Sequence, residues 1–206
     1  MVQSLNLAGI RGVFSILRSP HLLMPHLAVS DIRSIPYEKL RSQGINYLVF
    51  DKDNCLTAPY ANHIHPEFEA AWSHCLSVFP RSNILIVSNS AGTPDDKDCK
   101  AAHAVEKGLG VQVLQHKVKK PGCGGEILAR LSGASASEVA VVGDRLATDV
   151  VLANLNGMLA IWTRDIVTEE GDNAVAARLR GMEHWAYEML RKRSVKAPSH
   201  PSGVSH

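Results

Sequence analysis

The 206-residue sequence lacks the features that define several common classes of protein. Its four cysteines form no C-x-x-C pair, so neither a zinc cluster nor a disulfide framework is expected, and a reducing compartment is the simplest interpretation. It contains no run of about 18 uncharged apolar residues, so we do not expect a transmembrane helix. The net charge is only +2, and this balance does not point to a nucleic acid as partner.

The sequence also lacks the motif of a cysteine-dependent phosphatase. Such an enzyme needs His-Cys, five further residues and then Arg, so that a thiolate lies beside a phosphate cradle. The nearest candidate is Cys123, but Gly122 precedes it and Ala129 occupies the position of the required arginine. This class is therefore nearly excluded.

The first 30 residues contain no acidic side chain, although Arg11 and Arg18 are present. Apolar side chains recur at helical spacing within residues 3–18, which predicts a short amphipathic helix; they are Leu7, Ile10, Phe14 and Leu17. Such a helix could lie in a membrane interface, pack on its own domain or act as a mitochondrial-type targeting segment. We take residues 1–40, including a proline-broken apolar run at 20–29, as a membrane-association segment.

From about residue 45 onward, short β-rich runs alternate with helical stretches. The five expected strands are Asn46–Phe50, Asn83–Val87, Val111–Gln115, Val139–Val142 and Met158–Trp162. Helices are expected at 66–78, 96–108, 121–131, 148–155 and 172–192. This alternation predicts an α/β fold over residues 41–193, with a doubly wound, five-stranded parallel sheet covered on both faces. Residues 194–206, rich in serine, proline and histidine, are expected to form a disordered tail.

Polar side chains follow four of the predicted strands. In an open parallel sheet, ligands bind beyond the carboxyl ends of the strands, so these side chains should meet at one edge. The candidates in chain order are Asp51, Asp53, Ser88, Asn89, Lys119, Lys120, Asp144, Arg145 and Asp149. Carboxylates, a hydroxyl and lysines at one edge form, by composition, a site for magnesium and phosphate.

The carboxylates predict a divalent metal. Mg²⁺ prefers hard oxygen ligands, and neighbouring carboxylates repel one another unless a cation neutralises them. Asp51 and Asp144 can be direct ligands, Asp149 can ligate the ion or orient a bound water, and Asp53 completes the predicted metal set. We therefore expect Mg²⁺ as the cofactor.

The same residues can carry phosphate transfer. Asp51 is a competent nucleophile that would form a covalent aspartyl-phosphate. Asp53 could protonate the leaving oxygen and then deprotonate the water that hydrolyses the intermediate. Lys120 can neutralise charge around the phosphorus, and Ser88 can donate a hydrogen bond to a phosphate oxygen.

Three further residues are candidates for binding the substrate: Asn89, Lys119 and Arg145. Lys119 competes with Lys120 for the contact with phosphate. Arg145 could face a second phosphate or form a surface ion pair, and the sequence leaves both readings open.

The motifs resemble, in order, the four motifs of the haloacid-dehalogenase-like phosphatases; the matching residues are Asp51 to Cys55, Ser88, Lys120, and Gly143-Asp144 with Asp149. Longer stretches at 50–57, 87–92, 119–123 and 142–149 resemble the mitochondrial phosphatidylglycerophosphate phosphatases within that superfamily. The resemblance covers roughly residues 45–165. One position departs from the superfamily motif, because Cys55 stands where Thr or Val is usual, but its similar size should preserve the turn.

This resemblance implies hydrolysis of phosphatidylglycerophosphate to phosphatidylglycerol on the way to cardiolipin. It also implies a place at the mitochondrial inner membrane, with the matrix face expected. The intervals from Asp51 to Ser88 and from Ser88 to Lys120 leave no room for the cap domain that many relatives insert, so the site should be open. An open site suits a phosphate that is displayed on a membrane or a protein.

We accordingly expect a phospholipid substrate at a membrane surface and peripheral attachment through the N-terminus. Capless relatives often form homo-oligomers, and the resemblance implies the same here. Two alternatives stay open. One is the same chemistry on a phosphoprotein or a phosphosugar. The other is a non-catalytic phosphate-sensing module, against which Asp53 and Lys120 argue because a sensor needs no acid poised to release phosphate.

Overall fold

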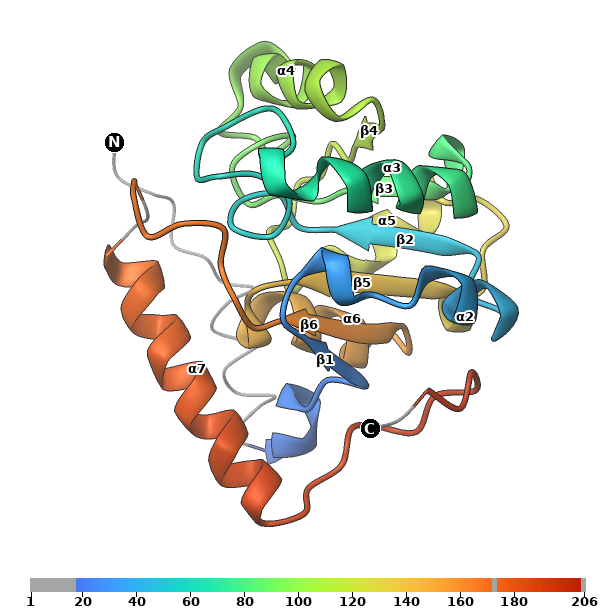
Figure 1. Cartoon of the computed structure of the whole chain (residues 1–206), viewed down its shortest axis with the longest axis vertical. Helices are drawn as coiled ribbons and strands as arrows, with labels where there is room; N and C mark the ends of the chain where they lie inside the picture. The colour runs from blue at the N-terminus through green and yellow to red at the C-terminus, as the bar shows by residue number, and fades with distance from the viewer. Residues whose placement is uncertain (1–17, 172–173, 205–206) are drawn as a thin grey trace.

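The computed structural model describes residues 18–171 and 174–204, and its centre is one parallel sheet (Figure 1). Runs of Val, Ile and Leu form the strands because both faces of the sheet are covered. The strand order is β1-β6-β5-β2-β3-β4. The strands are β1 (Leu27–Val29), β2 (Tyr47–Phe50), β3 (Ile84–Ile86), β4 (Gln112–Val113), β5 (Val139–Gly143) and β6 (Leu159–Thr163). The predicted α/β class and the parallel sheet are confirmed.

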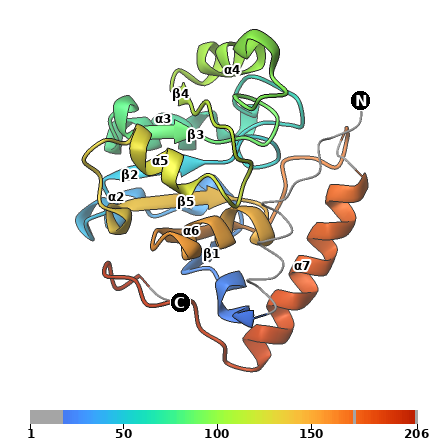
Figure 2. The same cartoon turned by 180° about the vertical axis from the view of Figure 1, so that it is seen from behind.

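Helices cover both faces of this sheet, as Figures 1 and 2 show from opposite sides. Successive residues of a strand point to opposite faces. Leu48 and Phe50 of β2 therefore pack with α2, α3 and α4, whereas Val49 packs with α5, α6 and Tyr187 of α7. The helices are α2 (Tyr37–Ser42), α3 (Glu69–Val78), α4 (Lys100–Leu109), α5 (Gly124–Arg130), α6 (Val151–Leu155) and α7 (Ala174–Lys192).

The sheet has six strands rather than the five that we predicted, because β1 adds a short edge strand beside β6. Leu27 pairs with Ile161, and β1 comes from the apolar run that we had assigned to the N-terminal segment. Just before it, the 3₁₀ helix η1 (Pro20–Leu23) is anchored by Asn154, whose Nδ2 donates to Leu22 O at 2.7 Å. The sheet and its covering helices therefore begin before the predicted boundary at residues 40/41.

The C-terminal residues 194–204 lie against the domain, so the disorder predicted for residues 194–206 is wrong over this range. Val195 and Ala197 are partly buried against the core. His26 Nε2 lies 2.9 Å from the carbonyl oxygen of Pro198, and the rings of His26 and His200 meet edge to face. Apolar and ring contacts hold this segment despite its polar composition.

The predicted helix at 148–155 starts earlier than expected, as a π-helical turn, η7 (Leu146–Val150), that continues into α6. The intervals between Asp51 and Ser88 and between Ser88 and Lys120 hold α3 and α4 with short connecting elements, so neither interval contains a cap domain. The amphipathic helix predicted at 3–18 falls almost entirely outside the described residues. Within the residues that the structure does describe, no helix has the length and apolar character to cross a membrane.

Candidate active site

Two neighbouring strands of the sheet, β2 and β5, deliver the central acidic side chains. Asp51 follows β2, and Asp144 follows β5. The two strands pair in parallel, and Asp51 N donates to Val142 O at 2.8 Å, so both strands end at the same edge. This is the edge at which ligands bind in open parallel sheets.

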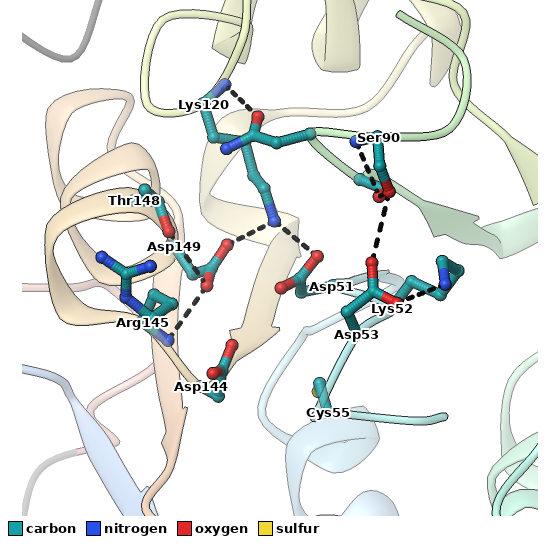
Figure 3. A network of polar contacts seen from close by, with 12 residues as sticks. Asp51, Lys52, Asp53, Cys55, Ser90, Lys120, Asp144, Arg145, Thr148 and Asp149 are labelled. Atoms are coloured by element: carbon teal, nitrogen blue, oxygen red, sulfur yellow. Dashed lines mark hydrogen bonds and ion pairs between the residues drawn. The ribbon is translucent and has the colours of Figure 1, made fainter. Parts of the chain in front are cut away.

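Three carboxylates converge at this edge, as Figure 3 shows. One ligand oxygen each from Asp51, Asp144 and Asp149 lies within 4.8 Å of the other two. Asp144 and Asp149 are buried, and Asp51 is nearly so. Hard carboxylate oxygens at this spacing fit a divalent cation such as Mg²⁺. The predicted convergence of Asp51, Asp144 and Asp149 is thus what the structure shows.

Lys120 neutralises part of this charge. Its Nζ lies 2.7 Å from Asp51 Oδ1 and 2.7 Å from Asp149 Oδ1 (Figure 3). Burial alone would lower the pKa of Lys120, but the ion pairs with Asp149 and Asp51 raise it above the ordinary lysine value. The side chain is therefore a fixed positive charge beside the Asp51 carboxylate.

The remaining negative charge is costly to bury. Burial raises the pKa of Asp51, Lys120 opposes that shift, and the charge of Asp149 adds to it. Burial also raises the pKa of Asp144 well above its usual range; the charges of Asp51 and Asp149 add to this shift, while Arg180 opposes it. Carboxylates that repel one another in this way are stabilised by a bound cation.

Asp149 is held in place by its own loop. Arg145 N donates to Asp149 Oδ2 at 3.1 Å, and Thr148 Oγ1 donates to the same oxygen at 3.3 Å. The carboxyl group also packs directly on Gly143, where an added Cβ would lie 2.4 Å from Asp149 Cγ. Only glycine leaves room for the Asp149 carboxylate at this point.

The loop after β3 brings Ser88 to the same edge. Ser88 Oγ is buried and accepts hydrogen bonds from Ser90 N at 3.1 Å and Ala91 N at 3.4 Å. Asn89 Oδ1 accepts from Lys120 N at 2.9 Å, which ties this loop to the loop that carries Lys120. His116, which we had not singled out, supports the arrangement because its Nε2 lies 2.9 Å from Ser88 O.

The Asp53 carboxylate lies outside the three-carboxylate cluster, although we had included Asp53 among the metal ligands. Its Oδ1 accepts from Lys52 Nζ at 2.5 Å and from Tyr60 N at 2.8 Å, and its Oδ2 accepts from Ser90 Oγ at 3.2 Å (Figure 3). These neighbours turn the side chain away from Asp144 and Asp149. The placement suits proton transfer better than side-chain ligation of the metal.

Two predicted substrate-binding residues are engaged elsewhere. Lys119 Nζ pairs with Asp95 at 2.7 Å, so Lys120 is the lysine that reaches the carboxylates. Arg145 pairs with Glu183 of α7, with Nη2 at 2.8 Å from Oε1. The sequence left open whether Arg145 faces a second phosphate or forms a surface ion pair. The structure shows an ion pair, but its partner Glu183 is largely buried rather than at the surface.

Helix α7 completes the wall of the site through contacts that the sequence did not predict. Arg180 Nη1 lies 3.0 Å from Asp144 Oδ2, and both side chains are buried. Glu183 also accepts from Leu146 N at 2.9 Å, at the start of the loop that carries Asp149. The helical periodicity of residues 172–192 was visible in the sequence, but no pattern showed where this helix would pack.

A second contact holds the backbone of Asp144 in place. Trp162 Nε1 donates to the Asp144 carbonyl at 3.0 Å, and the Trp162 ring packs edge to face on Tyr187 of α7.

Cys55, which departs from the superfamily motif, is buried with its Sγ 3.9 Å from Val142 O. The turn after Asp51 is therefore compatible with cysteine, as we expected.

The structure has a capless, doubly wound parallel sheet with aspartates after β2, a serine after β3, a lysine before α5 and further aspartates after β5. This order of elements and side chains places the chain in the haloacid-dehalogenase-like class that the sequence resembles. The chain belongs to the mitochondrial phosphatidylglycerophosphate (PGP) phosphatase family, whose family model matches residues 7–168. No solved structure matches the chain.

Curated relatives agree with this assignment. The chloroplastic/mitochondrial phosphatidylglycerophosphate phosphatase 1 of Arabidopsis thaliana is 36% identical over 200 residues, which cover 96% of this chain and 57% of the relative. The mitochondrial phosphatidylglycerophosphatase of Saccharomyces cerevisiae is 39% identical over 165 residues, which cover 78% of this chain and 88% of the relative. The chain thus spans little more than half of the Arabidopsis protein but most of the yeast one.

Proposed function

We propose that this protein is a Mg²⁺-dependent phosphatase that hydrolyses phosphatidylglycerophosphate to phosphatidylglycerol and phosphate. One observation carries the proposal: Asp51, Asp144, Asp149 and Lys120 meet at the carboxyl edge of the sheet in a member of the PGP phosphatase family. Relatives named for this activity align with most of the chain. The proposed substrate is a phosphomonoester on a membrane lipid, and its phosphate can enter an open site because no cap domain covers the carboxylates.

Asp51, Asp144 and Asp149 would hold Mg²⁺, which supplies positive charge against the phosphate oxygens. Lys120 adds a second positive charge beside Asp51. A phosphate dianion resists attack by an anion, and these charges remove that resistance.

The reaction then needs two steps at Asp51. In the first step, a carboxylate oxygen of Asp51 attacks phosphorus, the bond from phosphorus to the glycerol oxygen breaks, and protonated Asp53 gives its proton to that oxygen. In the second step, a water attacks the phosphorus of the aspartyl-phosphate and gives its proton to Asp53. Inorganic phosphate leaves and the Asp51 carboxylate is restored.

Location and assembly form the finer part of the proposal. The Saccharomyces relative is named mitochondrial, which supports a mitochondrial location for this chain. The lipid substrate favours the inner membrane, and we propose its matrix face. We further propose peripheral attachment through the N-terminus and a homo-oligomeric state, both consistent with an uncapped site that works on a bilayer.

The test compares phosphate release from phosphatidylglycerophosphate in vesicles with and without Mg²⁺, for the wild type and for Asp51→Asn. We expect release only with Mg²⁺ and only from the wild type. Uncatalysed phosphomonoester hydrolysis is among the slowest known reactions, with enzymatic enhancements up to about 10²¹, so loss of the nucleophile should leave no measurable rate. Near-normal turnover by Asp51→Asn would refute the mechanism.

The same assay separates the rivals. A strong preference for soluble sugar phosphates or phosphopeptides over the lipid would favour a phosphoprotein or phosphosugar phosphatase. A stable phosphorylated protein without release of phosphate would favour the sensing module.

Asn89→Ala, a change at a residue that joins the Ser88 and Lys120 loops, should give an intermediate rate rather than none.

A further inference from the structure

The outward side of α7 presents large apolar side chains to solvent. Met182 and Trp185 are each 67% exposed, and Val175 and Leu179 are also exposed. Large apolar side chains gathered in this way on one exposed side of a helix form a patch of the kind that is often functional on a soluble protein. We call these four residues the α7 apolar face.

The opposite side of the same helix forms the wall of the active site. Arg180 pairs with Asp144, Glu183 pairs with Arg145, and Tyr187 packs on Trp162. These three residues of α7 follow one another at helical spacing and are buried. Whatever lies against the α7 apolar face is therefore one helix diameter, about 10 Å, from the catalytic carboxylates.

Charge narrows the choice of occupant. Between Val175 and Trp185 the sole acidic residue is Glu183, which is buried against Arg145, whereas Arg178 is exposed among the apolar side chains. A shallow hollow lined by Arg178, Gly181, Met182, Trp185 and Ala186 lies over this part of the helix. At the C-terminal end Arg191 pairs with Glu188, and two further basic side chains, Lys192 and Arg193, are exposed. An apolar face with flanking cations and an aromatic ring is typical of a helix that lies in the interface of an anionic bilayer.

Size and charge favour a bilayer over a second copy of the chain. A stable protein–protein interface uses about 20–30 residues per partner, many more than the four of the α7 apolar face. Pairing this face with its own copy would also bring two exposed Arg178 side chains together.

We propose that α7 is a lipid-docking helix, and that its apolar face lies in the interface of an anionic phospholipid bilayer while its other face holds the active site. This rests on the proposed function, because the acyl chains of a phospholipid substrate remain in the bilayer while its phosphate enters the site. Docking through α7 brings the carboxylate cluster within one helix diameter of the headgroups. It adds a second contact to the attachment proposed for the N-terminus.

The first test uses the full-length chain and vesicles of phosphatidylcholine and phosphatidylglycerol that contain phosphatidylglycerophosphate. Trp185→Glu and Met182→Glu should raise the KM for vesicle-presented substrate by about ten-fold or more, since a charge must then enter the interface. The kcat on a soluble phosphomonoester should stay within about two-fold. Trp185→Phe, which keeps the apolar ring, should restore the wild-type KM. The control is Leu155→Glu on α6, which places the same charge at an exposed apolar side chain outside the α7 apolar face and should leave the KM for vesicle-presented substrate unchanged.

The second test uses tryptophan fluorescence. Trp72 and Trp162 are buried, so vesicles should affect Trp185 alone among the three tryptophans. Vesicles should shift its emission to shorter wavelengths, phospholipids with brominated acyl chains should quench it, and both effects should vanish in Trp185→Phe.

Several outcomes would overturn the proposal. Emission from Trp185 that brominated vesicles leave unchanged, while the wild type hydrolyses substrate in them, would exclude docking through α7. Emission that is already shielded without vesicles would show that another part of the chain covers the face. A fall in oligomeric mass for Trp185→Glu, with vesicle binding intact, would assign the face to a contact between copies. Failure of the proposed function looks different: the wild type would then release no phosphate from phosphatidylglycerophosphate even in detergent.

Discussion

The contact between α7 and the Asp149 loop gives the sharpest test of how the active site is held. We expect Glu183→Gln to lower both the stability of the protein and its kcat. The substitution keeps the shape of the side chain but removes the negative charge that Arg145 pairs with at 2.8 Å. Because Arg145 N also donates to Asp149 Oδ2, a displaced Arg145 would loosen a proposed metal ligand.

The size of the effect follows from the contacts. Glu183 accepts from the Arg145 guanidinium and from Leu146 N, and hydrogen bonds to charged groups contribute about 1.5–3 kcal/mol against about 0.5–1.5 kcal/mol for neutral ones. Breaking a buried pair outright costs about 3–5 kcal/mol, but glutamine still offers one acceptor. We therefore expect a loss of about 2 kcal/mol in the free energy of unfolding, or about 5 °C in Tm for a domain of this size.

The measurements are urea unfolding, Mg²⁺ titration of activity, and kcat on a soluble phosphomonoester. The matched control is Glu188→Gln on the same helix, because Glu188 makes an exposed ion pair with Arg191 at 2.9 Å. Exposed pairs contribute little, so the control should leave the unfolding midpoint and kcat unchanged. Equal effects of the two substitutions would refute the view that α7 positions the Asp149 loop.

Three further predictions test other parts of the structure. Lys120→Met should lower kcat by about 10²–10³-fold, as loss of a charge that stabilises the transition state does, whereas Lys119→Met should change it by no more than a few-fold. Gly143→Ala should weaken Mg²⁺ binding measured by calorimetry, since the new Cβ would displace the Asp149 carboxylate. Burial lowers the pKa of His26 from 6.5 to about 4, so between these pH values the unfolded chain binds more protons than the folded one, and acidification should lower the free energy of unfolding. Urea unfolding at pH 7 and at pH 5 measures this drop in stability, and His26→Gln should make the drop smaller.

The central part of the site was predictable because it depends on local sequence and on sheet topology. Asp51 and Asp144 each come directly after an apolar run, and parallel strands end at one edge. Gly143 before Asp144, and Pro121-Gly122 after Lys120, add recognisable spacing. Asp51, Asp144 and Asp149 therefore met as expected, and Asp53 alone of the four predicted metal ligands has its carboxylate outside the cluster.

The sixth strand was missed because β1 is only three residues long and follows Pro25. A short apolar run between a proline and a polar turn has no helical or alternating period that separates a strand from an amphipathic segment. Its place in the sheet comes from partners far along the chain, such as Ile161 and Asn154. The C-terminal segment was misjudged for a similar reason, since its contacts with His26 join residues 172 positions apart.

Helix α7 marks the limit of what a single sequence could tell. Its periodicity was clear: Val175, Leu179 and Met182 recur on one side of the helix, and the apolar side of a helix commonly faces the core. The structure instead buries Arg180, Glu183 and Tyr187 and exposes Met182 and Trp185. Charged side chains on a predicted helix are usually solvated, so the local sequence does not show that Arg180 will pair with Asp144 and Glu183 with Arg145. The segment after β5 buries the negative charge of Asp144 and the positive charge of Arg145, and a buried charge is costly unless it has a partner of opposite sign. Arg180 and Glu183 of α7 supply these partners. The sequence alone does not show this requirement, because it arises only when the folded sheet buries Asp144 and Arg145.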